Sequence, residues 1–398
     1  MNKETIGILD IGSQKIKFLI LSLDEKNFIK IHSKNLIFSS GVKKGNIVDL
    51  EKLSLVIKQC IATAEKDVNS EFKEIYVGLG SVNFNFNCFG VSRDIGSYEV
   101  EEKKDLQSVV DSSVLIFENC NPSEKIIHLI NSGFILDKKN FVENPLKMKC
   151  DTLQTNFSFI SVNSNILLSF DNLLKSCGLK VKRYFYTPYA ISILSADQEI
   201  FNRGFVSIDF GYETTSVTIF ENGNLIFSKI LPLGSHFITK DLAKAFDIDF
   251  NLSENIKINF KNLMKNDLTT LNNIKKKISL ELVDTVINAR VDEIIDYITE
   301  VLKFSNSIQK SSRKIVLSGG GSGLEIFNEK LKKRFGGVVE NVKQAFPIKN
   351  TEFNIFSDYL ACLGIAKLIF FKDKKEILRF KSSQKSFFQK FYSLFLEN

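Results

Sequence analysis

The chain begins with an apolar run that ends in a tight polar turn. Residues 6–9 read Ile-Gly-Ile-Leu, and Asp-Ile-Gly-Ser follows at 10–13. Apolar side chains then recur at every second position, at 16, 18 and 20. This pattern predicts a strand, a tight turn at Gly12 and a returning strand.

The same pattern returns in the second half of the chain. An apolar run at 205–208 leads into Asp209-Phe210-Gly211, and a second run follows at 216–220. Asn222-Gly223 then predicts a hairpin turn into a third strand at 225–230. A unit that recurs at this distance predicts two similar halves that face each other.

Each half offers one carboxylate and one glycine turn. Glycine turns present backbone N–H groups to phosphate oxygens, and carboxylates bind Mg²⁺ directly or through water. Lys17, or else Lys15, is placed to reach a phosphate. A single Asp-x-Gly is most simply an ordinary turn, whereas two in matching contexts favour a binding site.

A third glycine segment follows an apolar run at 315–317. Ser318 is succeeded by Gly319, Gly320 and Gly321, and then by a helical pattern with Leu324, Phe327 and Leu331. Glycines at a strand-to-helix turn permit close approach of a ligand to the backbone. The GK[ST] ending of a phosphate-binding P-loop is missing, and so is the GxGxxG spacing of a dinucleotide site.

Composition narrows the class of protein. The 398 residues carry a net charge of +7 with no dominant basic block, which does not favour nucleic-acid binding. The six cysteines form no CxxC pair, and the three histidines are scattered. The N-terminus lacks a signal-peptide pattern and no run of about 18 apolar residues occurs, so we expect a cytoplasmic protein.

The order of these three segments resembles the actin and heat-shock-chaperone ATPase superfamily. The resemblance implies an α/β fold of two domains with duplicated ribonuclease-H-like cores, which close on ATP and Mg²⁺. Asp10 and Asp209 become the expected catalytic and metal-binding carboxylates, with the metal held directly or through water. The expected nucleotide-binding residues are Gly12, Ser13, Lys17, Gly211, Thr214, Thr215, Gly319, Gly320 and Gly321. Residues 188–190 and 361–364 look like the two connecting helices at the hinge.

Several stretches are similar to the bacterial cell-division family FtsA. These are residues 41–49, 127–137 with 144–148, and 233–242, the second of which resembles the inserted subdomain of that family. Glu254 and Lys257 stand where the family places residues near the ribose and base. The resemblance implies subdomain 1A at 1–80 and 161–195 with 357–370 returning to it, inserted subdomain 1C at 81–160, subdomain 2A at 196–230 and 311–356, subdomain 2B at 231–310, a linker at 371–385 and an amphipathic helix at 386–398.

The second phosphate loop departs from the family. Tyr212 and Glu213 replace small residues, and Ser216 replaces an Asp. A carboxylate at 213 weakens phosphate binding by repulsion unless it joins the metal site. Weak or absent ATPase activity is therefore expected. In the insert, Lys147, Lys149, Cys150 and Thr152 also depart from the family, which affects the self-assembly contacts.

The residue pattern at the C-terminus predicts a contact with a membrane. Residues 371–385 are charged and read as a flexible linker, and an aromatic segment follows. On a helix, one face gathers large apolar side chains and suits an anionic membrane interface. A last helix docked on the protein's own core is the alternative. The expected membrane-binding residues are Phe387, Phe388, Phe391, Tyr392 and Phe395.

Residues 270–310 read as long helices and carry the expected partner site. Asn288 to Glu293 resemble the family segment near the site for the C-terminal peptide of FtsZ, with Arg290 and Glu293 as contacts. An internal ion pair between Arg290 and Glu293 is the alternative reading.

The expected function is that of an actin-like protein that tethers FtsZ filaments to the cytoplasmic face of the inner membrane at the division site. It would be a peripheral membrane protein, would assemble into filaments and would recruit later division proteins. The alternatives are another actin-like scaffold, similar to PilM or MreB, and a small-molecule kinase or phosphatase of the same superfamily.

Overall fold

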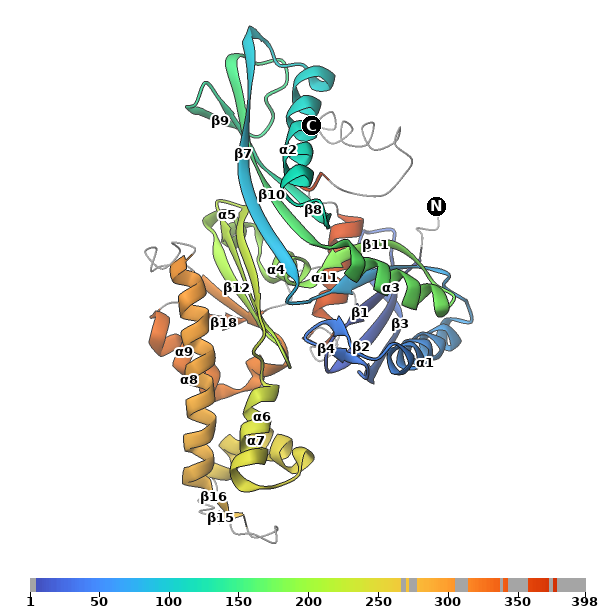
Figure 1. The fold of residues 1–398 in the computed structure, drawn as a ribbon, viewed down its shortest axis with the longest axis vertical. Helices are drawn as coiled ribbons and strands as arrows, with labels where there is room; N and C mark the ends of the chain where they lie inside the picture. The colour runs from blue at the N-terminus through green and yellow to red at the C-terminus, as the bar shows by residue number, and fades with distance from the viewer. Residues whose placement is uncertain are drawn as a thin grey trace.

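The computed structural model describes residues 5–265, 270–271, 278–304, 314–336, 339–342, 357–371 and 375–377. Two five-stranded sheets and one four-stranded sheet form its main framework (Figure 1). The first two sheets belong to what we call the first and second lobes, and the third belongs to an inserted domain that extends away from both.

The sheet of the first lobe has the order β11-β6-β1-β2-β3. β1, β2 and β3 are antiparallel neighbours, whereas β6 and β11 join in parallel. α1 (Leu50–Val68), capped by the Asp49 side chain, and α3 (Ser164–Ser176) complete this lobe together with the β4–β5 hairpin (Val42–Lys43 and Asn46–Ile47). The strands of the sheet are β1 (Ile6–Ile11), β2 (Lys15–Leu23), β3 (Ile29–Phe38), β6 (Glu74–Leu79) and β11 (Lys180–Tyr186).

The sheet of the second lobe repeats this topology. Its order is β14-β13-β12-β17-β18, with the first three strands antiparallel and the last two added in parallel. The strands are β12 (Phe205–Phe210), β13 (Thr215–Glu221), β14 (Asn224–Leu231), β17 (Lys314–Ser318) and β18 (Val339–Asn341). The predicted duplication is thus confirmed, because each lobe uses the same strand order and directions.

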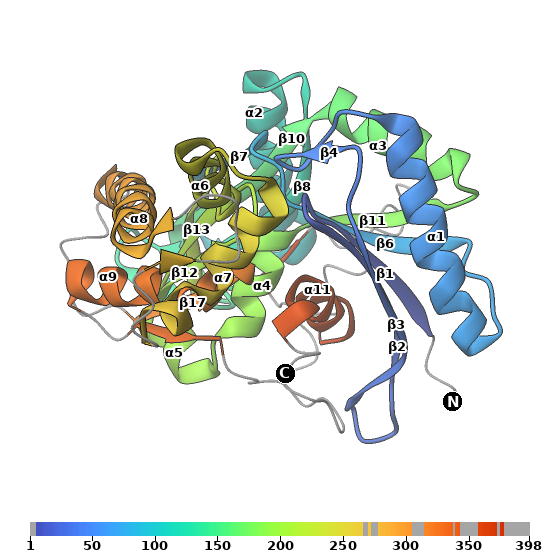
Figure 2. The same cartoon turned by 90° about the horizontal axis from the view of Figure 1, so that it is seen from below.

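Two helices cross between the lobes (Figure 2). α4 (Thr187–Ser195) packs on β12 and β13, and α11 (Leu360–Phe370) packs on β1 and β2. Their backbones nearly touch, since a Cβ added at Gly364 would lie 2.2 Å from the carbonyl oxygen of Ala190. Residues 188–190 and 361–364 therefore lie on the connecting helices that the sequence predicted.

The inserted domain is a sheet of order β7-β10-β8-β9 covered by α2 (Gln107–Cys120). A single π-helical turn at Glu102–Leu106 leads into α2. Its core consists of side chains from α2 and from the long strands, including Phe117, Phe157 and Phe159. The strands are β7 (Phe84–Glu99), β8 (Glu124–Leu136), β9 (Asn140–Val142) and β10 (Lys149–Asn163).

Helices cover the second lobe, and one predicted boundary is wrong. The helix predicted to begin near residue 270 begins at Leu280, because Ile278–Ser279 pairs with Thr270–Leu271 as a two-stranded ribbon, β16 with β15. Ile274 lies outside the described residues. The helices are α5 (Gln198–Arg203), α6 (His236–Phe246), α7 (Phe250–Lys265), α8 (Leu280–Phe304) and α9 (Glu325–Phe335). No helix in the described ranges is long and apolar enough to cross a membrane.

The predicted flexible linker needs a correction at residues 375–377. Glu376 forms an isolated antiparallel bridge with Ile130 of β8, and its side chain is only 2% exposed. Ile377 is buried in the core of the inserted domain. Sequence composition missed this because the three residues dock on partners that are remote in the chain.

Candidate functional site

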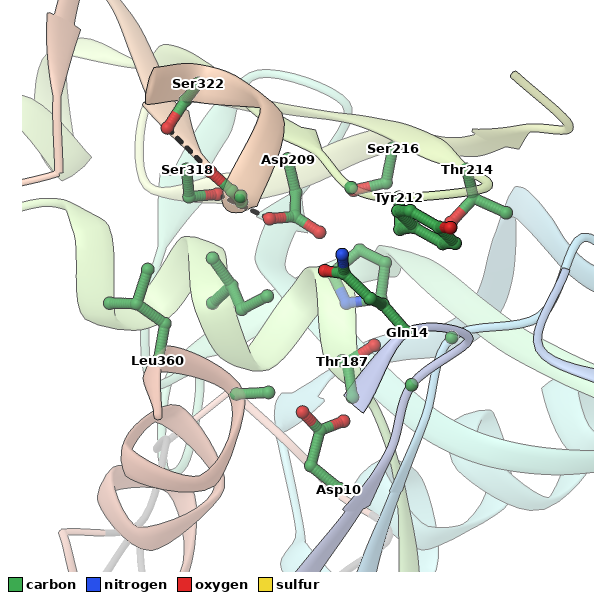
Figure 3. A pocket seen from close by; sticks show the side chains of 18 of the residues that line it. Asp10, Gln14, Thr187, Asp209, Tyr212, Thr214, Ser216, Ser318, Ser322 and Leu360 are labelled. Carbon is green, nitrogen blue, oxygen red and sulfur yellow. Dashed lines mark hydrogen bonds between the residues drawn. The ribbon is translucent and has the colours of Figure 1, made fainter. Parts of the chain in front are cut away.

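A cleft of about 430 Å³ lies between the lobes. Its walls come from the β1–β2 turn, the β12–β13 turn and the turn after β17, and helices α4 and α11 contribute to its lining. Figure 3 shows Asp10 and Gln14 on one side of this cleft, and Asp209, Thr214 and Ser216 on the other. The three glycine segments predicted from sequence thus meet at one place.

Asp10 and Asp209 occupy equivalent positions in the duplicated sheets. Each is the penultimate residue of the first strand of its lobe. Across the hairpin, Asp10 pairs with Lys17 and Asp209 pairs with Ser216. The topology therefore brings the two carboxylates to the same cleft, while their neighbours differ.

The Asp10 carboxylate forms an ion pair with a lysine of its own lobe. Lys17 Nζ lies 3.1 Å from Asp10 Oδ2. Burial lowers the pKa of Lys17, but the Asp10 carboxylate, together with Cys362 and Asp209, outweighs this effect and raises it. Lys17 therefore stays charged and carries a positive charge to the cleft lining.

Asp209 has weaker compensation. Burial raises the pKa of its carboxyl, against the lowering effects of a 2.9 Å hydrogen bond from Ser318 Oγ and of the Lys17 charge. The Ser216 hydroxyl is buried beside it, and among the described residues it has no hydrogen-bond partner. A partly buried, under-compensated carboxylate next to an unpaired hydroxyl is an arrangement that a bound cation would satisfy.

The two aspartates are followed by turns of the same construction. The Gly12 N–H donates to the Lys15 carbonyl at 3.2 Å, and the Gly211 N–H donates to the Thr214 carbonyl at 2.9 Å. A Cβ at either glycine would meet that same carbonyl oxygen within 3 Å. Both turns accordingly require glycine and aim their backbone at the cleft.

The three glycines after β17 have different roles. Gly319 adopts φ +84°, and a Cβ there would lie 2.4 Å from the Phe210 carbonyl oxygen. Gly320 has no atom within 4 Å of an added Cβ and lines the cleft. Gly321 packs on the Phe210 ring and lies outside the cleft lining, unlike its two neighbours.

Glu213 lines the cleft from the second lobe, and its carboxylate accepts a hydrogen bond from the first lobe. The backbone N–H of Lys44, in the turn between β4 and β5, donates to Glu213 Oε2 at 2.6 Å. The next N–H, of Gly45, donates to Ser13 Oγ at 3.2 Å. One turn thus contacts both Asp-x-Gly loops, and part of the charge that was expected to repel a phosphate is compensated.

Tyr212, the other departure in this loop, stacks near His236 with ring centroids 4.5 Å apart. Burial, together with the charges of Glu254 and Glu213, raises the pKa of Tyr212 to about 12. Its hydroxyl is therefore neutral at physiological pH.

Some predicted nucleotide residues lie away from the cleft lining. Thr215 is buried and donates to the Leu233 carbonyl. Lys257 Nζ bonds Glu254 Oε2 at 2.8 Å and Thr239 Oγ1 at 3.0 Å, and burial lowers the pKa of Lys257. Glu254 and Lys257 thus form an ion pair within α7 that also bonds Thr239 of α6.

The sequence reading missed several lining residues. Gln14 follows Gly12 in the first turn, Thr187 begins α4, and Asp358 precedes α11, whereas Lys15, which also lines the cleft, was named from sequence as the alternative to Lys17. Lys15 Nζ lies 3.7 Å from Asp358, so this pair connects the first turn to the second hinge helix. No local pattern marks Thr187 or Asp358, because only the fold brings them to the cleft.

The described part of the chain holds no group of three or more His, Cys, Asp or Glu side chains that could bind a metal. Asp10 and Asp209 both line the cleft, and two carboxylates fit a Mg²⁺ that takes most of its ligands from phosphate oxygens and water.

A second, shallower pocket of about 450 Å³ lies between α6 and α8. Arg290 Nε lies 2.5 Å from Asp241 Oδ2, its Nη2 lies 3.0 Å from Oδ1, and Nη1 bonds Glu293. The alternative reading of Arg290 as an internal ion pair is thus what the structure shows. Lys244, also in this pocket, is exposed.

The predicted membrane residues Phe387, Phe388, Phe391, Tyr392 and Phe395 lie outside the described residues.

Comparison with known proteins agrees with this geometry. A family model described as "Cell division protein FtsA" matches residues 206–356. The protein of that name from Buchnera aphidicola subsp. Baizongia pistaciae is 27% identical, and the match covers 94% of each chain. The one from Bacillus subtilis is 25% identical over 80% of this chain and 74% of its own. This chain is similar to FtsA over most of its length.

Solved structures support the fold of this chain. The PilM-PilN type IV pilus biogenesis complex superposes with a TM-score of 0.65 at 16% identity, covering 92% of this chain and 98% of that one. MreB5 of Spiroplasma citri bound to ADP gives 0.52 at 12% identity, covering 92% and 96%. At such identities the likeness shows an actin-like fold alone.

Proposed function

We propose that this chain is an actin-like cell-division protein that binds Mg-ATP between its lobes and tethers FtsZ filaments to the cytoplasmic membrane. The observation that carries the proposal is the convergence of two equivalent Asp-x-Gly turns on one cleft, in a chain whose curated relatives are named cell-division proteins.

The cleft residues divide the work of nucleotide binding. Lys17 supplies positive charge, and the turn residues that follow Gly12 and Gly211 supply backbone N–H groups for phosphate oxygens. Asp10 and Asp209 would hold Mg²⁺, mainly through water, and the metal would neutralise phosphate charge. Gly320 leaves open space where the backbone can approach the ligand closely.

Binding between the lobes would stabilise their closed arrangement, because the ligand contacts both. The turn at Lys44 and Gly45 already bridges the two Asp-x-Gly loops in this way. A closed, uniform shape favours head-to-tail assembly into filaments, so nucleotide binding would promote polymerisation. With Ser216 in place of a carboxylate, we expect turnover of ATP to be slow or absent.

The pocket between α6 and α8 is the proposed site for the FtsZ C-terminal peptide. Arg290 and Glu293 shape this pocket as an ion-paired network with Asp241. Because two carboxylates already bind Arg290, the exposed Lys244 is the better candidate to attract an acidic peptide.

The C-terminal segment is the proposed membrane anchor. Its aromatic residues would bury apolar surface in the interface, and one copy would bind reversibly. Polymerised copies would bind more firmly through avidity, which links filament formation to membrane attachment. The protein would thus sit at the cytoplasmic face of the membrane at the division site and recruit later division proteins.

Calorimetric titration with Mg-ATP tests the site directly. Wild type should bind, and Asp10→Ala and Asp209→Ala should each weaken binding at least tenfold. Glu71→Ala, which removes an exposed carboxylate far from the cleft lining, is the matched control and should bind like wild type. Equal affinity in all four proteins would refute the site.

A further inference from the structure

Residues Lys375, Glu376 and Ile377 form a short docking strand at the root of the C-terminal tail. The Asn131 N–H donates to the Lys375 carbonyl at 2.8 Å, and the Ile377 N–H donates to the Leu129 carbonyl at 2.7 Å. The strand thus adds to β8 of the inserted domain. Ile377 is 5% exposed, and its side chain lies in the core of that domain.

A buried ion pair fixes the centre of this strand. The Glu376 carboxylate bonds Arg183 of β11 and lies 2.5 Å from Nδ1 of His128 on β8. Burial raises the pKa of Glu376, but the charge of Arg183 and the hydrogen bonds from Arg183 and His128 outweigh this and lower it. A carboxylate at this depth would be costly without these partners, so the pairing selects one position for the strand.

The tautomer of His128 follows from its other neighbour. The Tyr186 N–H donates to Nε2 of His128 at 3.0 Å, so Nε2 is an acceptor and the proton sits on Nδ1. Nδ1 then donates to Glu376. Arg183 Nη2 also lies 3.3 Å from Nδ1, but a protonated Nδ1 has no lone pair to accept, so Arg183 is assigned to the carboxylate.

This hydrogen-bonded chain ends at the wall of the cleft. Tyr186 is the last residue of β11, and the next two residues, Thr187 and Pro188, begin α4 and line the cleft. Glu376, His128 and Tyr186 therefore connect the root of the tail to a hinge helix through buried groups.

The same strand also contacts the second lobe. Lys375 Nζ donates to the Gly223 carbonyl at 3.0 Å and to Asn224 Oδ1 at 2.7 Å. These residues form the β13–β14 turn, which belongs to the duplicated sheet that carries Asp209. One three-residue segment is thus bonded to the inserted domain, the first lobe and the second lobe.

We infer that Lys375–Glu376–Ile377 is a conformation-sensitive dock that holds the root of the C-terminal tail more firmly when the two lobes are closed. A change in lobe separation moves the β13–β14 turn relative to β8 and β11, so Lys375 loses its partners while Glu376 keeps its own. Occupancy of the cleft and the position of the tail are thereby coupled. This coupling of the cleft to the tail rests on the proposed nucleotide binding, whereas the docking of residues 375–377 does not.

Hydrogen exchange of the full-length protein tests the dock without nucleotide. The amides of Ile377 and Asn131 should exchange at least tenfold more slowly than in an unstructured peptide. Glu376→Ala should remove this protection, and Glu71→Ala should leave it intact. An Ile377 amide in wild type that exchanges at the unstructured rate would overturn the dock.

Repeating the measurement with saturating Mg-ATP tests the coupling. In wild type, exchange at Ile377 should slow several-fold. In Lys375→Ala, which leaves the buried Glu376 cluster intact and so avoids the folding risk of Glu376→Ala, Ile377 should stay protected but should no longer respond to nucleotide. Lys26→Ala, at an exposed lysine, is the matched control and should respond like wild type.

Nucleotide affinity, measured on the same samples, separates the possible failures. Bound nucleotide with unchanged Ile377 exchange in wild type overturns the coupling alone. Absence of binding overturns the proposed nucleotide function together with the coupling, while the nucleotide-free exchange still decides the dock.

Discussion

At the residue scale, the duplicated sheets show how equivalent positions acquire different electrostatics. Asp10 faces Lys17 across its hairpin, whereas Asp209 faces the neutral Ser216. The first carboxylate is therefore paired within its own lobe, and the second is compensated chiefly by a serine hydroxyl. The charge of Asp209 is therefore expected to favour binding of a cation but to lower the stability of the nucleotide-free protein.

Asp209→Asn should stabilise the nucleotide-free protein at neutral pH. A carboxyl whose folded pKa is raised lowers stability at pH values above its ordinary 3.8, because the folded state disfavours the ionised form. The amide removes this cost, and its oxygen can still accept from Ser318. A thermal melt should show a higher Tm. Asp10→Asn, which leaves the half-buried Lys17 without its partner, should show a lower one, and a Tm change of the same sign in both would contradict this account.

Glu376 should make stability fall in acid. Its folded pKa lies below the ordinary 4.5, so its contribution is complete above that value and is lost as pH falls through the folded pKa. Arg183, His128 and Lys375 are the charged or titratable groups of the strand and its partners. Urea unfolding should show that wild type exceeds Glu376→Gln in stability at pH 7, by a margin that shrinks below about pH 4.5. A margin independent of pH would contradict the ion pair.

At the scale of elements, the crossing of α4 and α11 sets the geometry of the hinge. Gly364 lies where the helices touch, and no larger residue fits without moving a backbone. Both helices also line the cleft, through Pro188 and Ile191 of α4 and Ala361 of α11.

Gly364→Ala should therefore destabilise the protein by about 1–3 kcal/mol, which is typical of overpacking. Gly320→Ala is the matched control for stability, because an added Cβ there meets nothing within 4 Å. Chemical denaturation of both variants checks this. Equal stability of the two would mean that the helices separate without cost.

Local patterns predicted the elements that are built from neighbouring residues. The hairpins after Asp10 and Asp209, the Asn222-Gly223 turn with positive φ at both residues, and the turn after β17 all follow from alternation and glycine placement. The meeting of the three glycine segments was predicted from their order and from the family resemblance.

The remainder depended on contacts between distant residues. Glu376 reaches His128 across 248 positions and Arg183 across 193. The composition of residues 371–385 looks like a linker, and nothing in it marks the three that dock. The spacing of Arg290 and Glu293 indicated an internal ion pair, but the bidentate partner of Arg290, Asp241, stands 49 positions away on another helix.

At the scale of the whole molecule, three sheets meet on the side of the hinge while the cleft opens between two of them. The dock at residues 375–377 joins all three units where the C-terminal tail begins. A tail rooted there is positioned by the same lobes that enclose the proposed nucleotide site. The proposed tether thus combines a nucleotide-dependent body, a peptide pocket and an anchor in one chain.

Vesicle co-sedimentation tests this tether most directly. Full-length protein and a 1–383 truncation, which keeps the dock and removes the aromatic segment, are mixed with anionic vesicles that carry or lack the FtsZ C-terminal peptide. We predict that the full-length protein pellets with both kinds of vesicle, and that the truncation, with an unchanged Tm, pellets only with peptide-bearing vesicles. If neither protein binds either kind of vesicle, the tether is wrong; a truncation that unfolds would show that the aromatic segment belongs to the core.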